Sequence, residues 1–124
     1  MTKFQGIVKK HMGRGNRLGF PTANLGITAD IAEGVYAAFV ILGEKKLPAL
    51  VFSGKAVTFG DNKKLFEVYI LDFNQDLYGQ EIEVQLLKHM RGVEKFDTAA
   101  ELILQMQKDE ELARKYFKQY NLEN

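Results

Sequence analysis

A single change of hydrophobic period along the chain is the feature that most constrains its fold. Side chains alternate with a period of two over residues 82–86, which is typical of a half-buried strand. From Thr98 the period becomes helical, because residues 98–101 form a capping box and apolar residues then recur near helical spacing. Consecutive strands followed by one helical segment, with no strand–helix alternation, favour an antiparallel barrel or sandwich closed by a helix.

Other strands are predicted by short runs of β-branched and aromatic residues. These runs cover residues 4–10, 35–42, 47–53 and 65–73, and the first is the weakest. A short polar turn between the second and third runs suits a hairpin. The C-terminal segment is predicted to be helical, either continuous or with a break near Asp109, and the charge run over residues 108–111 is predicted to face solvent.

The composition is that of one globular domain over residues 1–124. The chain is 46% hydrophobic and 27% charged, and its net charge of +1 gives no field that would draw it to nucleic acid or to an anionic membrane. It has no cysteine, which excludes disulfides and thiolate chemistry, and no apolar stretch near the ~20 residues of a spanning helix. We therefore expect a cytoplasmic protein that binds neither nucleic acid nor membranes.

A polar segment over residues 13–24 contains three glycines and two arginines. Glycines let backbone amides approach an anion closely, and Arg14 and Arg17 supply charge-assisted hydrogen bonds to phosphate oxygens. The segment matches neither the Walker phosphate loop nor the dinucleotide fingerprint. A phosphate site and a plain surface loop are therefore both compatible with its spacing.

Two polar residues follow Pro21, which biases the chain toward extended backbone. Thr22 and Asn24 should then project from the same side. Both offer oxygen atoms, which Mg²⁺ prefers, so they are candidate ligands of a nucleotide-bound ion. The alternative is that they only cap the loop, and without further context the pattern favours that alternative.

Glu67 is the only charge in the apolar run over residues 65–71. A carboxylate among apolar neighbours is costly unless it is paired, and such a group is a candidate general base for a hydroxyl. The alternative is a glutamate on the solvent face of a strand, which is the commoner arrangement.

Taken together, these residues resemble the riboflavin kinase family. The likeness runs over about residues 6–113 and includes the Gly-Phe-Pro-Thr-Ala-Asn segment over residues 19–24, Glu67 within a strand, Asp-Leu-Tyr-Gly over residues 76–79 and Met-Arg over residues 90–91. It is similar to the kinase module of the bacterial bifunctional enzymes. The resemblance implies a six-stranded antiparallel Greek-key β-barrel with a C-terminal helical segment, which agrees with the pattern of periods.

The resemblance also implies a reaction, in which ATP and riboflavin give FMN and ADP. On that basis Thr22 and Asn24 hold Mg²⁺, and Glu67 deprotonates or orients the terminal ribityl hydroxyl. Further roles follow by motif position: Gly13, Arg14, Gly15, Arg17, Ile70, Asp72 and Tyr78 around the nucleotide, and Arg91, Glu94 and Phe96 near the flavin.

The residues are also compatible with two other functions. Residues 52–57 differ from the loop usual in bacterial members, which leaves a catalytically impaired barrel that binds flavin or nucleotide as the alternative. A small barrel that binds single-stranded nucleic acid is a third, against which the near-neutral charge argues. Because the chain starts almost at the first strand, with no nucleotidyltransferase half, we expect it to make FMN and not FAD. We also expect it to be a monomer.

Overall fold

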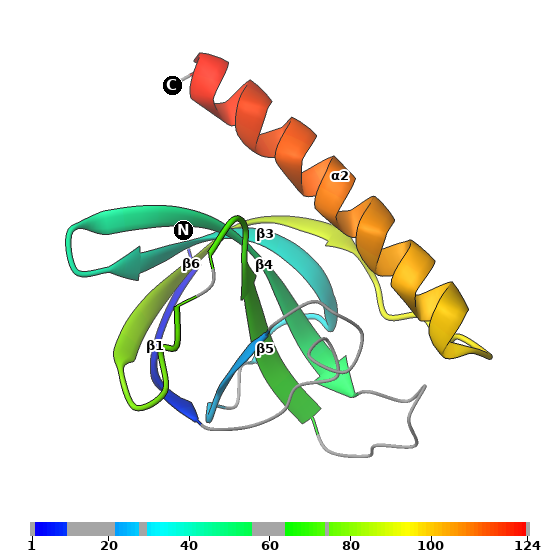
Figure 1. Cartoon of the computed structure of the whole chain (residues 1–124), viewed down its shortest axis with the longest axis horizontal. Helices are drawn as coiled ribbons and strands as arrows, with labels where there is room; N and C mark the ends of the chain where they lie inside the picture. Colours follow the sequence, from blue (N-terminus) through cyan, green and yellow to red (C-terminus); the bar gives the residue numbers. More distant parts are fainter. Residues whose placement is uncertain (1, 10–21, 28–29, 56–63, 74, 124) are drawn as a thin grey trace.

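The computed structural model describes residues 2–9, 22–27, 30–55, 64–73 and 75–123, and shows a closed barrel with a long helix along its outside (Figure 1). The elements are β1 (Thr2–Lys9), β2 (Ala23–Leu25), β3 (Gly34–Leu42), β4 (Lys45–Lys55), β5 (Lys64–Ile70), β6 (Glu81–Arg91) and α2 (Ala99–Glu123). The order around the barrel is β1-β2-β5-β4-β3-β6, and neighbouring strands are antiparallel. Because β6 returns beside β3, the first strand of the β3–β4–β5 meander, this is a Greek key, and the predicted fold class is confirmed.

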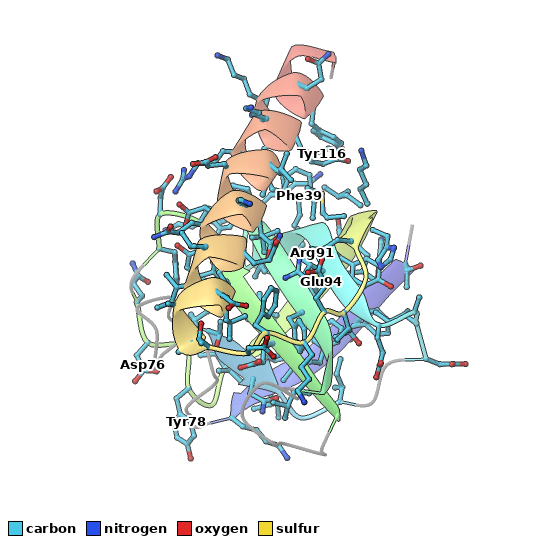
Figure 2. All side chains as sticks on the ribbon, turned by 90° about the vertical axis from the view of Figure 1, so that its right-hand side faces the viewer. Phe39, Asp76, Tyr78, Arg91, Glu94 and Tyr116 are labelled. Atoms are coloured by element: carbon cyan, nitrogen blue, oxygen red, sulfur yellow. The ribbon has the colours of Figure 1, made fainter. Side chains whose placement is uncertain are left out.

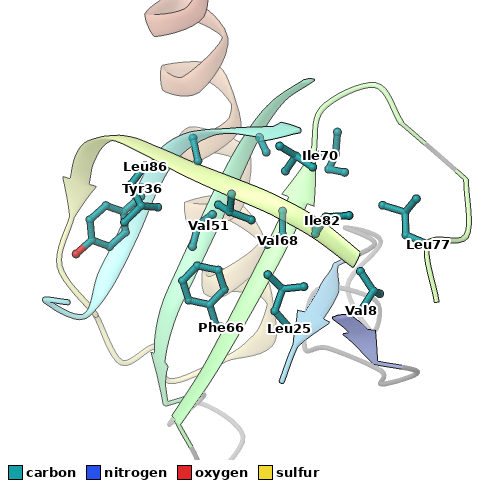
Figure 3. Packing of buried hydrophobic residues seen from close by; sticks show 14 residues of the cluster. Val8, Leu25, Tyr36, Val51, Phe66, Val68, Ile70, Leu77, Ile82 and Leu86 are labelled. Atoms are coloured by element: carbon teal, nitrogen blue, oxygen red, sulfur yellow. The ribbon is translucent and has the colours of Figure 1, made fainter. Parts of the chain in front are cut away.

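Two layers of apolar side chains stabilise this arrangement. Alternate residues of the strands fill the barrel interior, among them Leu25, Phe66 and Ile82, each at most 1% exposed (Figure 3). The opposite faces of β3 and β4 carry a second cluster, in which Phe39 packs against Phe117 of α2 with ring centroids 5.4 Å apart. The β3–β4 hairpin is therefore covered on both faces, which accounts for the unbroken apolar run of β3.

The strand β6 is longer than the sequence analysis predicts. This strand continues to Arg91, beyond the alternation over residues 82–86, and its register against β3 shifts twice along that length. The shifts leave Leu87 and Met90 without a Cα partner in β3, and both side chains join the cluster beside α2. Such bulges break a period of two, so the alternation could not show the full length of β6.

Other differences from the prediction are local. The three-residue strand β2 was not predicted, since three residues are too few to display a period. The strand β5 ends at Ile70 instead of residue 73, because the chain turns at Leu71 and Asp72, where Asp72 has a φ of 55°.

The helix α2 is continuous, so the predicted helix is confirmed and the alternative of a break near Asp109 is wrong. Thr98 caps it, its Oγ1 accepting a hydrogen bond from the Glu101 N–H at 3.2 Å, as the capping box predicts. The prediction that residues 108–111 face solvent is wrong at Asp109, which is 6% exposed and points at the barrel. Within the described part of the chain, no helix is long and apolar enough to cross a membrane.

Candidate active site on the outer face of the barrel

Glu67 lies in the middle of β5 with its side chain on the outer face of the barrel. Its neighbours Phe66 and Val68 point into the interior, which turns Glu67 the other way. The residue is nevertheless only 2% exposed. Its Oε1 accepts a hydrogen bond from Thr22 Oγ1 at 3.1 Å, and its Oε2 has no hydrogen-bond partner among the described residues. A buried carboxylate oxygen without a partner is costly and marks a candidate functional atom.

Asn24 stands beside the same carboxylate. The strand β2 pairs with β5 so that Asn24 is directly opposite Glu67, and residues opposite one another in antiparallel strands share a face. Thr22 and Asn24 therefore lie on one side of the chain, as Pro21 predicts, and both lie next to Glu67. Hydroxyl, amide and carboxylate oxygens come together here, which is a donor set that Mg²⁺ accepts.

An apolar pocket opens beside Glu67, between the barrel and α2. It measures about 420 Å³, counting the space at its open mouth. Its lining residues are Thr22, Val35, Leu50, Val51, Phe52, Glu67, Tyr69, Met106 and Asp109. Largely apolar walls with a few polar groups are typical of a site for a small organic molecule. Sequence reasoning missed the share of α2 in this pocket, although an acidic residue on the apolar face of the helix was a signal of a buried partner.

Arg91 and Asp109 form an ion pair at the edge of this pocket. Arg91 Nε donates to Asp109 Oδ1 and the Arg91 terminal nitrogen NH2 donates to Oδ2, both at 2.8 Å, and the side chains are 15% and 7% exposed. Gln105 Nε2 donates to Asp109 Oδ1 at 3.0 Å. Arg91, predicted near the flavin, thus contacts a residue that lines the pocket.

The other residues predicted near the flavin follow β6. Glu94 is exposed and Phe96 is half-buried in the segment that leads to α2. Figure 2 shows Glu94 next to Arg91, beside the helix. The structure therefore places Arg91 and Glu94 on the side of the barrel that faces α2.

Of the residues predicted around the nucleotide, the structure describes Ile70, Asp72 and Tyr78. Gly13, Arg14, Gly15 and Arg17 lie outside the described residues. The side chain of Ile70 packs in the barrel interior, and Tyr78 is 57% exposed in a turn, apart from Arg91 and Glu94 in Figure 2.

Asp72 contacts α2 from its turn after β5. Its two carboxylate oxygens accept hydrogen bonds from Arg114 at 2.9 and 3.0 Å. These hydrogen bonds and the guanidinium charge lower the pKa of Asp72. Nearby, Tyr69 Oη donates to Glu110 Oε1 at 2.5 Å, so the end of β5 and the middle of α2 are joined by polar contacts on this side of the pocket.

The family model for flavokinase, riboflavin kinase, matches residues 1–117. The chain belongs to this family, as its sequence motifs indicate.

Relatives support the same assignment. The bifunctional riboflavin kinase/FMN adenylyltransferase of Escherichia coli (strain K12) is 40% identical over 106 residues, which are 83% of this chain and 34% of that protein. The RNA-binding riboflavin kinase of Bacillus subtilis (strain 168) is 33% identical over 119 residues, which are 94% of this chain and 52% of that protein. The chain thus spans about a third of the first relative's length and about half of the second's.

A solved structure shares the fold. The riboflavin kinase of Trypanosoma brucei matches with a TM-score of 0.63 at 21% identity, covering 98% of this chain and 82% of that one. The barrel with its outer helix is therefore an arrangement already known in this family.

Proposed function

We propose that this chain transfers the γ-phosphate of ATP to the terminal ribityl hydroxyl of riboflavin, giving FMN and ADP. The observation that carries the proposal is the unpartnered Oε2 of Glu67, buried next to Thr22 and at the wall of an apolar pocket. Membership of the riboflavin kinase family supports the same reaction.

Glu67 is the group that acts on the hydroxyl. Its Oε2 accepts the hydroxyl proton or orients it, the hydroxyl oxygen bonds to the γ-phosphorus, and the bond from that phosphorus to the β-phosphate oxygen breaks to release ADP. The hydrogen bond from Thr22 fixes the carboxylate so that Oε2 keeps one direction. The apolar walls suit the flat ring of a flavin, whose binding excludes water from the reacting hydroxyl.

Thr22 and Asn24 would hold a Mg²⁺ ion that arrives with the nucleotide. The fit rests on their oxygen atoms and on the unpartnered carboxylate oxygen opposite Asn24. When bound, the ion neutralises charge on the transferring phosphates.

Further contacts in this proposal follow the family motifs. Around the nucleotide they are made by Gly13, Arg14, Gly15, Arg17, Ile70, Asp72 and Tyr78, and near the flavin by Glu94 and Phe96, while Arg91 acts there through its contact with Asp109 of the pocket wall. For Ile70, whose side chain is inside the barrel, any such contact falls to the backbone.

The decisive experiment incubates the protein with riboflavin, ATP and Mg²⁺ and separates the flavins by chromatography. Wild type is expected to form FMN, and Glu67→Gln is expected to lower kcat by about 10²- to 10⁴-fold, since the amide cannot accept the proton. Circular dichroism confirms that the variant is folded. Normal turnover in Glu67→Gln would reject the assigned base, while bound riboflavin without FMN from wild type would favour the impaired binding barrel.

Asn24→Ala tests the metal site while leaving the hydrogen bond from Thr22 to Glu67 in place. It removes one oxygen ligand and is expected to raise the KM for MgATP by about tenfold. Titration with Mg²⁺ at fixed ATP checks this, and an unchanged metal requirement would contradict the assigned ligand.

A further inference from the structure

The Arg91–Asp109 pair joins the two elements that border the pocket. Arg91 is the last residue of β6, and Asp109 lies near the middle of α2. Asp109 lines the pocket itself, and Met106, one turn earlier on the same helix, lines it too. The Arg91–Asp109 contact therefore holds α2 next to the pocket that contains Glu67.

Three of the five N–H donors of Arg91 are used within the protein. Two of its nitrogens are used by Asp109, and its third, NH1, donates to the Gly92 carbonyl at 2.9 Å. Asp109 is equally satisfied, since Arg91 and Gln105 together occupy both carboxylate oxygens. Its charge is neutralised at the pocket wall.

We propose that Arg91 is a positioning residue: by holding Asp109 it fixes the α2 wall of the Glu67 pocket, and so sets the affinity for riboflavin while leaving the phosphoryl transfer step to Glu67. This inference rests on the proposed function. Loss of either partner leaves the other as an unpaired buried charge, which is stable only if α2 moves so that water reaches it. Movement of α2 displaces Met106 and Asp109 and widens the pocket.

A double-mutant cycle distinguishes positioning from direct contact with the flavin. Arg91→Gln and Asp109→Asn each leave one buried charge unpaired. The double variant leaves no unpaired charge, and its two amides can hydrogen-bond to each other. Positioning predicts that each single variant raises the KM for riboflavin by about tenfold, and that the double variant returns to within about threefold of wild type. In all three, kcat is expected to stay within about twofold of wild type, since Glu67 and Thr22 are untouched.

Direct contact predicts a different pattern. Arg91→Gln and the double variant would be equally impaired, and Asp109→Asn would bind riboflavin as well as wild type or better, because it frees the arginine. That pattern, or a loss of kcat at unchanged KM, would overturn the proposal.

A control variant and a substitute variant complete the experiment. Arg114→Gln breaks the other Arg–Asp contact of α2, whose side chains are 44% and 75% exposed, and is expected to leave the KM for riboflavin within about twofold. If Arg91→Gln does not fold, Arg91→Lys is measured outside the cycle: lysine keeps the charge but not the two-pronged contact, so positioning predicts a higher KM for riboflavin with kcat within about twofold of wild type. Wild type that forms no FMN rejects the proposed function and this inference with it, whereas active wild type without rescue rejects this inference alone.

Discussion

Tyr69 contributes a phenol to the wall of the pocket, half-buried between β5 and α2. Burial, followed by its hydrogen bond to Glu110, raises the pKa of Tyr69 to about 12. The neutral phenol is therefore favoured in the folded state. The stability this shift supplies is fully present below the ordinary value of 10 and is lost as the pH rises through 12.

Alkaline titration tests this arrangement. The difference in phenolate absorbance between wild type and Tyr69→Phe is expected to show one step near pH 12. Glu110→Gln removes the charged acceptor and should move that step toward lower pH. A step at the ordinary tyrosine value in wild type would contradict the hydrogen bond.

Ser53 carries a second buried oxygen without a partner among the described residues. Its side chain is fully buried in β4, and Oγ makes no hydrogen bond in the described part of the chain. Ser53→Ala removes a polar atom that is not compensated, so we expect the free energy of unfolding to rise by about 1 kcal/mol. Urea denaturation measures it, and a loss of stability would instead indicate a bound partner for Oγ.

Among the elements, the junction of β3 and β6 is the most tightly constrained. Gly34 has a φ of 145°, and a Cβ there would lie 2.1 Å from the Arg91 carbonyl oxygen. That oxygen belongs to the backbone of the strand end that presents Arg91 to α2. Only glycine fits both the dihedral angle and the close approach.

Gly34→Ala is therefore expected to lower the free energy of unfolding by about 3 kcal/mol. Gly43→Ala is the matched control, because Gly43 also has a positive φ, of 60°, but a Cβ there meets nothing within 4 Å. The control should cost about 1 kcal/mol, which is the dihedral cost alone. Equal losses in the two variants would show that the close approach to β6 does not matter.

How far the sequence predicts these elements depends on whether their cause is local. Alternation and apolar runs predicted the cores of β3, β4, β5 and β6, because one residue in two meets the interior. Bulges at Leu87 and Met90 and the turn at Asp72 altered the ends, and no local pattern shows them.

The same distinction applies to the candidate site, where local patterns predicted some residues and a distant contact determines others. Pro21 was enough to predict that Thr22 and Asn24 share a side, and the isolated charge in its run singled out Glu67. The position of Asp109 on the apolar face of the helix indicates a buried partner, but no local pattern identifies that partner, because Arg91 is 18 residues away. Read locally, a charge in the middle of a helix suggests a solvated face or a break.

In the whole molecule, α2 and the barrel share one hydrophobic cluster. Phe117 is 6% exposed, and its ring lies against Phe39 of β3. Since neither surface is covered without the other, helix and barrel are expected to unfold together in a single transition. Far-ultraviolet circular dichroism of the helix and near-ultraviolet signals of the tyrosines should then report the same midpoint.

Phe117→Ala sharpens this test. It opens a cavity between helix and barrel and is expected to cost about 3–5 kcal/mol. Both signals should shift by the same amount. A helix signal that is lost before the tyrosine signal would show that α2 is an independent unit.

The closed order of strands also governs how the protein folds. The β3–β4 hairpin joins residues close in sequence. The pairing of β1 with β6, by contrast, brings Thr2 opposite Leu86, and β2 pairs with β5 although the strands β3 and β4 lie between them in the sequence. Such distant pairings form late and slowly, because the entropy of closing the loop is lost before contacts are gained. Asn24 and Glu67 become neighbours only at that final stage, so a partly folded intermediate would contain hairpins but no assembled site.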